Sequence, residues 1–231
     1  MTVPLDKIVP WGRSCDEYRR MFDLTDHDLD QSILGCGDGP ASFNAELAAQ
    51  GKRVISVDPI YCHTAAEIER RIGEVWETML TTTRRHAAAF LWDEFETPER
   101  QAEIRRETMG VFLDNFAQTA EGTRYVAGAL PHLPFRNDAF DLALCSHYLF
   151  TYTDLLDESA HLQAILEMLR VAQTVRVFPL LAMFDGGKSR HLDGVTSALR
   201  GTGSTVRVRR VAYEFQRGGN EMLEIRGEQS T

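Results

Sequence analysis

A glycine-rich turn between an apolar segment and a helix is the feature that most constrains how this chain of 231 residues folds. The apolar residues that follow Ser32 enter the turn Gly35-Cys36-Gly37-Asp38-Gly39. Apolar residues at helical spacing then occupy 42–50, and a glycine follows, as at many helix ends. The run 53–58 has the pattern of a buried strand that ends in Asp58. Together these segments predict a β-α-β unit of about 30 residues.

Helical and strand patterns alternate along the rest of the chain. The spacing predicts helices over 65–90, 98–118, 157–171 and 189–199, and strands over 125–127, 140–145, 175–180, 206–213 and 222–225. Thr97 and Pro98 are residue types preferred at the cap and the first turn of a helix. This order predicts an α/β fold with a mostly parallel sheet that ends in an antiparallel hairpin.

Composition narrows the class of protein. Hydrophobic residues make up 43% of the chain and charged residues 26%, as in ordinary globular domains. The net charge of −9 argues against a nucleic-acid partner. We expect no membrane span, because no apolar run reaches about 18 residues, and no signal peptide. Four cysteines without a C-x-x-C pair predict reduced thiols, a cytoplasmic location and no metal site.

The glycine turn has the chemistry of a ligand site. Residues without Cβ atoms let a ligand approach the backbone, and the helix that follows offers free N–H groups. Asp58, at the end of the next strand, is placed to accept hydrogen bonds from ribose hydroxyls. We therefore expect an adenosine-containing ligand; the alternative is a tight turn that binds nothing. The dinucleotide pattern G-x-G-x-x-G fails at Ser42, and the phosphate-loop pattern is absent.

The turn resembles motif I of class I S-adenosylmethionine-dependent methyltransferases. Gly37 and Gly39 match the first two glycines of that motif and Ala41 the third; a second register begins at Gly35 and lengthens the spacing to Asp58. The runs 133–135 and 138–144 are similar to the family's segment before and within its fourth strand. The resemblance implies a single Rossmann-like methyltransferase domain over 1–231, with a seven-stranded sheet and a helical insert at 64–119.

The same resemblance implies that S-adenosylmethionine is the cofactor. The residues it assigns to the cofactor are Gly35, Gly37, Gly39, Asp58, Pro59, Ala129, Leu130 and Ser146. Two positions depart from the family: Gly35 and Ala129 stand where many members have acids. Residues 1–30 form a candidate lid, in which Arg13 would pair with the methionine carboxylate and Tyr18 would cover the sulfonium. The alternative for this lid is an arm packed on the sheet, with Arg13 in a surface ion pair.

The sequence says less about the molecule that would accept the methyl group. His147 follows the fourth strand, where it would be a general base for a hydroxyl acceptor or would only line the strand end. The insert 64–119 would cap an acceptor pocket, or its aromatic residues would form only its own core. We expect methyl transfer by in-line displacement to a small molecule. The alternatives are an RNA or protein methyltransferase and a non-catalytic module that binds S-adenosylmethionine.

Overall fold

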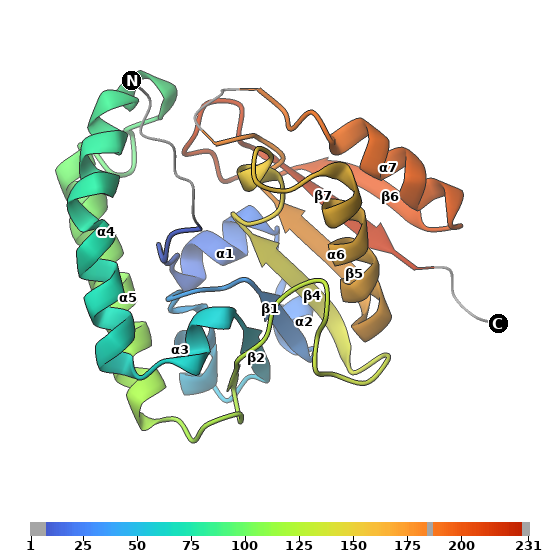
Figure 1. Ribbon diagram of the computed structural model, residues 1–231, viewed down its shortest axis with the longest axis horizontal. Coiled ribbons are helices and arrows are strands. Elements are labelled where there is room, and N and C mark those ends of the chain that lie inside the picture. The colour runs from blue at the N-terminus through green and yellow to red at the C-terminus, as the bar shows by residue number, and fades with distance from the viewer. Residues whose placement is uncertain (1–7, 184–186, 228–231) are drawn as a thin grey trace.

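A seven-stranded sheet forms the centre of the computed structural model, which describes residues 8–183 and 187–227 (Figure 1). Its order is β3-β2-β1-β4-β5-β7-β6. The strands are β1 (Ile33–Cys36), β2 (Val54–Val57), β3 (Tyr125–Val126), β4 (Phe140–Ser146), β5 (Ala172–Phe178), β6 (Thr205–Arg210) and β7 (Glu221–Arg226). The first five pair in parallel, and β7 runs antiparallel to both β5 and β6. The predicted fold class is confirmed.

Seven α-helices accompany the sheet in the part of the chain described. They are α1 (Cys15–Met21), α2 (Asp26–Leu29), α3 (Phe43–Ala49), α4 (Ala65–Arg85), α5 (Pro98–Gln118), α6 (Glu158–Val171) and α7 (Leu192–Gly201). The start of α5 is as predicted, because the Thr97 hydroxyl accepts a hydrogen bond from the Arg100 N–H and Pro98 occupies the first turn. Thr64 caps α4 in the same way, through the N–H of Glu67.

Alternate residues of the strands face two different helical layers. Leu142 and Leu144 of β4 pack with α1, α2 and α3, whereas Ala143 and Cys145 pack with α6 and α7. Both faces of the central strands are therefore buried, as in other parallel sheets covered by helices. This packing leaves the carboxyl ends of β1, β2 and β4 on one edge of the sheet, where the glycine turn lies.

The insert forms a helical hairpin beside the sheet. Helices α4 and α5 run next to each other at one side of the molecule (Figure 1). Phe112 and Phe116 of α5 pack against Tyr61 and Tyr125, with ring centroids 5.2 to 5.9 Å apart. These aromatic residues form a core between the hairpin and the segments that flank it in the sequence.

Several predicted boundaries differ from the structure. The helix expected over 65–90 ends at Arg85, since 87–89 form a 3-10 turn and Phe90 pairs with Gln216. Strand β5 ends at Phe178 and not at residue 180, because Pro179 has no N–H for the ladder. The helix expected from residue 189 begins at Leu192. The strand expected over 206–213 ends at Arg210, where its pairing with β7 stops.

Candidate functional site

The glycine turn begins directly after β1. Gly37 and Gly39 have φ angles of +66° and +53°, in the left-handed region that favours glycine. The N–H of Gly37 donates to the carbonyl of Val57 at 2.9 Å, which ties the turn to the end of β2. The turn therefore has the conformation that its two glycines predict, and it lies at the carboxyl edge of the sheet.

Asp58, which directly follows β2, is hydrogen-bonded to the glycine turn. Its Oδ2 accepts a hydrogen bond from the Gly39 N–H at 2.9 Å, and its Oδ1 accepts one from the Ile60 N–H at 2.8 Å. Burial raises the pKa of Asp58, against the lowering effect of these two bonds. Each carboxylate oxygen has a further lone pair, so a ligand with two hydroxyl groups can add hydrogen bonds here.

Asp38 is a site residue that the sequence analysis missed. Its Oδ1 accepts from the Tyr18 hydroxyl at 2.8 Å, and its Oδ2 accepts from the Ser56 hydroxyl at 2.6 Å. Burial raises its pKa to about 6, although both hydroxyl groups lower it. The side chain folds back over Gly35, so a carboxylate reaches the end of β1 where the sequence has no acid.

A cavity of about 540 Å³ opens at this turn. It is lined by nearly all the predicted site residues, namely Arg13, Tyr18, Gly37, Gly39, Asp58, Pro59, Ala129, Leu130, Ser146 and His147. Gly35 does not line it, because the Asp38 carboxylate lies between Gly35 and the cavity. The volume falls in the range of ordinary pockets for small molecules and cofactors, roughly 300–1,000 Å³.

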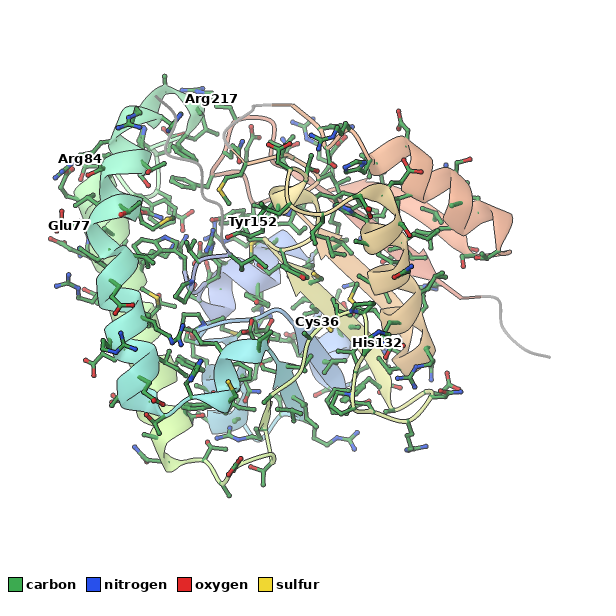
Figure 2. All side chains as sticks on the ribbon, in the orientation of Figure 1. Cys36, Glu77, Arg84, His132, Tyr152 and Arg217 are labelled. Atoms are coloured by element: carbon green, nitrogen blue, oxygen red, sulfur yellow. The ribbon has the colours of Figure 1, made fainter. Side chains whose placement is uncertain are left out.

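The N-terminal segment contributes walls that the sequence did not predict. Val9 and Trp11 line the cavity together with Tyr152, whose hydroxyl accepts a hydrogen bond from the Val9 N–H at 3.1 Å. The Trp11 ring packs on Trp76 of α4, with centroids 5.2 Å apart. This segment therefore lies between the sheet edge and the helical hairpin, near the middle of the molecule, where Figure 2 labels Tyr152.

One face of α4 also borders the site. Arg71, Val75, Met79 and Thr83 follow one another at four-residue steps and line the large cavity or the smaller one described below. Glu77 and Arg84 lie on the outer side of the same helix (Figure 2). The four-residue spacing is visible in the sequence, but only the structure shows which face is turned toward the sheet.

The two predicted lid residues have different environments. The Tyr18 ring stacks on Phe43 at 4.4 Å between centroids, so the ring belongs to the core and only its hydroxyl group reaches Asp38. Arg13 donates to the carbonyl of Trp11, and within residues 8–183 and 187–227 no carboxylate forms an ion pair with it. Among the carboxylates in these two ranges, none supplies the surface ion pair of the alternative interpretation.

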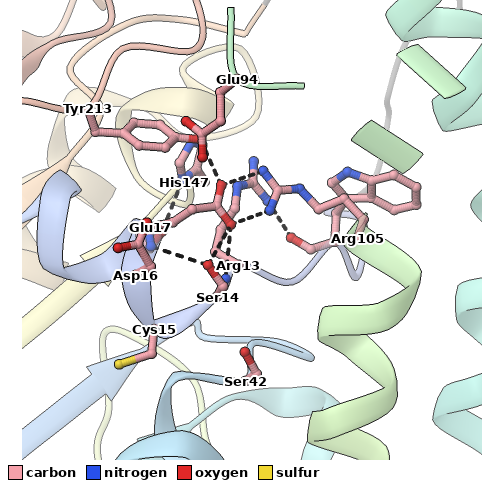
Figure 3. Close-up of polar contacts among 12 residues, drawn as sticks. Arg13, Ser14, Cys15, Asp16, Glu17, Ser42, Glu94, Arg105, His147 and Tyr213 are labelled. Atoms are coloured by element: carbon pink, nitrogen blue, oxygen red, sulfur yellow. Dashed lines mark hydrogen bonds and ion pairs between the residues drawn. The ribbon is translucent and has the colours of Figure 1, made fainter. Parts of the chain in front are cut away.

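A buried ion pair lies beside Arg13 (Figure 3). The guanidinium of Arg105, which is fully buried, binds both carboxylate oxygens of Glu17, and the Tyr213 hydroxyl donates to the same carboxylate at 2.8 Å. Burial disfavours ionised Glu17, but Arg105 outweighs it and holds the pKa of Glu17 well below its usual range. Glu17 and Arg105 are 88 positions apart in the sequence, and no local pattern predicts their pairing.

His147 stands at the end of β4 with a φ of +51°, which is uncommon for a residue with a Cβ atom. The ring Nδ1 lies 2.9 Å from the Ser146 hydroxyl, and the backbone N–H of His147 donates to the carbonyl of Phe178 at 2.7 Å. Burial, followed by the nearby charges of Arg13 and Arg105, lowers the pKa of His147 well below its ordinary value. The imidazole is therefore neutral at neutral pH.

A second cavity of about 110 Å³ adjoins the first. Five residues line both cavities: Val9, Trp11, Arg13, His147 and Tyr152. The other walls of the smaller cavity come from α4, α5, the segment after β5 and the connection between β6 and β7. His147 therefore lies where the two cavities meet.

Other kinds of site were sought over residues 8–183 and 187–227. This part of the chain contains no helix long and apolar enough to cross a membrane. In the same residues no three His, Cys, Asp or Glu side chains gather where a metal ion would be held. The four cysteines are free thiols, and Cys62 is the exposed one.

Comparison with known structures gives distant similarities. A magnesium protoporphyrin IX methyltransferase (ChlM) from Synechocystis PCC 6803 with bound SAM is similar over 92% of this chain and 90% of that one, with 12% identity and a TM-score of 0.44. A SAM-dependent methyltransferase from Aquifex aeolicus is similar over 90% of each chain, with 14% identity and a TM-score of 0.43. The fold assignment rests on the strand order of this chain and not on these structures.

Comparison with curated sequences gives a nearer relative. No family model matches the chain. The uncharacterized protein MJ0045 of Methanocaldococcus jannaschii is 32% identical over 216 residues, which cover 93% of this chain and 94% of that protein. On this similarity, the chain belongs to the family of the uncharacterized protein MJ0045.

Proposed function

We propose that this protein is an S-adenosylmethionine-dependent methyltransferase that acts on a small-molecule acceptor. The observation that carries the proposal is the position of the glycine turn and Asp58. Both lie at the carboxyl edge of a sheet with order β3-β2-β1-β4-β5-β7-β6, and both face the 540 Å³ cavity. In open α/β sheets this edge is where ligands bind.

The residues at this edge fit the polar groups of the cofactor. Asp58 is a half-buried carboxylate with lone pairs left for the two ribose hydroxyls. Asp38 is a second acid on the cavity wall, and its charge would complement the ammonium group of the methionine part. We infer that Asp38 takes the role of the acid that many family members have at the position of Gly35. The site would then have one carboxylate for the ammonium group and one for the ribose diol.

The chemistry needs alignment and a site from which water is excluded. S-adenosylmethionine, when bound, supplies an electrophilic methyl group on a sulfonium. Ser146 and His147, at the end of β4, would orient the acceptor atom for an in-line displacement. The lowered pKa of His147 leaves its imidazole neutral, so it would accept a hydrogen bond from the acceptor rather than carry a charge. The α4 face and Trp11 would exclude water from the site.

Isothermal titration with S-adenosylmethionine, S-adenosylhomocysteine and NAD tests the cofactor. We expect the first two to bind and NAD not to bind. Asp58→Ala should weaken S-adenosylhomocysteine binding by about tenfold to a hundredfold, because a hydrogen bond to a charged group contributes roughly 1.5–3 kcal/mol. Asp114→Ala is the matched control, since Asp114 is an exposed acid of α5 that lines neither cavity.

Equal affinities in wild type and Asp58→Ala would overturn the cofactor site. If S-adenosylmethionine binds, a screen of metabolites with a labelled methyl group tests turnover. Transfer to a small molecule supports the proposal. Salt-sensitive methyl transfer to RNA would show that the acceptor is RNA and not a small molecule. Binding with no transfer to small molecules, RNA or protein would leave a non-catalytic binding module.

A further inference from the structure

The walls of the smaller cavity combine apolar side chains with neutral polar ones and a charged one. Phe90, Phe178 and Phe215 line it, together with Met79 of α4. Arg13 is the charged residue on its wall among the residues described. Since apolar walls weaken the screening of a charge, an unpaired guanidinium here will attract an anionic group strongly.

No carboxylate of the described chain neutralises Arg13. The nearest candidate, Glu17, already binds Arg105 through both oxygens and Tyr213 through one of them. The Nε atom of Arg13 is buried and has no hydrogen-bond partner. Arg13, Arg105 and Glu17 together leave one positive charge beside the smaller cavity (Figure 3).

Two neutral polar side chains on the same wall also lack partners. The Thr151 hydroxyl is buried and makes no hydrogen bond within the part of the chain that the structure describes. The Gln101 side chain is 4% exposed, and none of the hydrogen bonds within residues 8–183 and 187–227 involves its amide group. Buried polar groups are normally paired, and the described residues supply no partner for these groups or for Nε of Arg13.

We propose that the smaller cavity binds the carboxylate of the methyl acceptor, and that the acceptor is therefore a small organic acid. This inference rests on the proposed function. Arg13 would form the ion pair, and the Thr151 hydroxyl and the Gln101 amide would donate to the carboxylate. One cation with two neutral donors suits a monoanion better than a phosphate dianion, whose second charge would stay buried without a partner.

The size of the cavity sets how the acceptor lies. At about 110 Å³ it is smaller than a cavity of roughly 150 Å³ that holds benzene, so it takes an end group and a few carbon atoms. The rest of the acceptor would extend past His147 into the larger cavity, where the methyl group is delivered. The carboxylate and the methyl-accepting atom are thus on opposite sides of His147.

Titration with matched acids and amides tests this inference. Benzoate, benzamide, propionate and propionamide are each titrated into the protein, with and without saturating S-adenosylhomocysteine, and binding is followed by NMR. We expect at least one acid to bind tenfold or more tightly than its amide. Arg13→Met should abolish this preference. Arg53→Met is the matched control, because Arg53 is exposed at the start of β2, at the opposite end of the strand from the site.

A second variant separates binding from folding. Thr151→Val keeps the shape of the side chain and removes a hydroxyl that has no partner among the described residues. It should weaken binding of the acid at least threefold and leave the midpoint of thermal unfolding unchanged or raised. An acid-over-amide preference that survives in Arg13→Met would overturn the inference, and so would the absence of any preference in wild type.

Titration with S-adenosylhomocysteine distinguishes a failure of the anion site from a failure of the proposed function. Acid binding that depends on Arg13 in a protein that does not bind S-adenosylhomocysteine would support the anion site and refute the proposed methyltransferase. Binding of S-adenosylhomocysteine without a preference for acids over amides would support the methyltransferase and overturn the anion site. The effect of Arg13→Met on S-adenosylhomocysteine affinity shows whether the same guanidinium also serves the methionine carboxylate, since Arg13 lines both cavities.

Discussion

The carboxylate of Asp38 fills the space that a side chain on residue 35 would need. A Cβ atom on Gly35 would lie 1.8 Å from Oδ2 of Asp38 and 2.5 Å from Oδ1. Contacts this short force one of the two residues to move. The glycine and the acid therefore depend on each other, and together they place a buried carboxylate on the wall of the 540 Å³ cavity.

Gly35→Ala should displace the Asp38 carboxylate. We expect it to lower the free energy of unfolding by about 1–3 kcal/mol, the usual cost of overpacking, and to weaken S-adenosylhomocysteine binding. Urea denaturation and titration measure the two effects. Gly110→Ala is the control, because nothing lies within 4 Å of that position in α5, and alanine there should stabilise the helix by roughly 1 kcal/mol. Unchanged stability and binding in Gly35→Ala would contradict the mutual dependence.

Binding of S-adenosylhomocysteine should depend on pH through Asp38. The raised pKa of about 6 means that Asp38 is largely protonated below that pH in the free protein. An ammonium group favours the ionised acid, so binding below pH 6 releases a proton. Affinity should therefore rise with pH, up to tenfold per unit, and level off above about pH 6 to 7. Asp38→Asn should flatten this profile, whereas Asp114→Asn should retain it; a rise that persists in Asp38→Asn would rule out this assignment.

His147 should remain neutral across the pH range in which the protein is studied. Its lowered pKa arises from burial and from the nearby arginines, so the ring nitrogens should show no protonation between pH 8 and pH 6.5 in a ¹⁵N NMR titration. A folded-state pKa below the unfolded value also means that His147 costs stability as the pH falls below about 6.5. His147→Asn, which tolerates the positive φ, should reduce this acid sensitivity. An inflection near 6.5 assigned to His147 would contradict the prediction.

Glu17→Gln should be strongly destabilising. It leaves the fully buried Arg105 without its counter-charge, and removing one partner of a buried ion pair typically costs about 3–5 kcal/mol. Its neighbour Asp16 provides the control, because the Asp16–Arg20 pair is exposed and Asp16→Asn should change stability by less than about 1 kcal/mol. Similar urea midpoints for the two variants would show that burial of the Arg105 pair has little energetic effect.

The sheet and the position of the glycine turn were predictable because their signals are local. A glycine turn after an apolar strand, with an acid at the end of the next strand, lies within about 30 residues and needs no tertiary information. The Thr97–Pro98 start of α5 is equally local, and it is confirmed. Strand β5, by contrast, begins at Ala172, directly after α6, because the ladder with β4 outweighs local preference there.

The parts that were missed depend on distant contacts. The sequence does contain a signal for Asp38, since this acid stands between two glycines and close to Gly35, where many family members have an acid. The position of its side chain over Gly35, however, depends on hydrogen bonds from Tyr18 and Ser56. The role of Trp11 depends on Trp76, which belongs to a helix 65 positions away in the chain. Such pairings are set by how the hairpin packs on the N-terminal segment, and nothing in the local pattern of either element specifies them.

The five residues shared by the two cavities have a thermodynamic consequence. A ligand that orders Val9, Trp11, Arg13, His147 and Tyr152 from one side also orders them for a ligand on the other side. If occupancy of one cavity changes the affinity of the other, linkage requires that the factor be the same in both directions. On the proposed function, an acceptor that binds more tightly when the cofactor is present must increase the affinity of the protein for the cofactor by the same factor. The bound acceptor would thus slow the loss of unreacted cofactor.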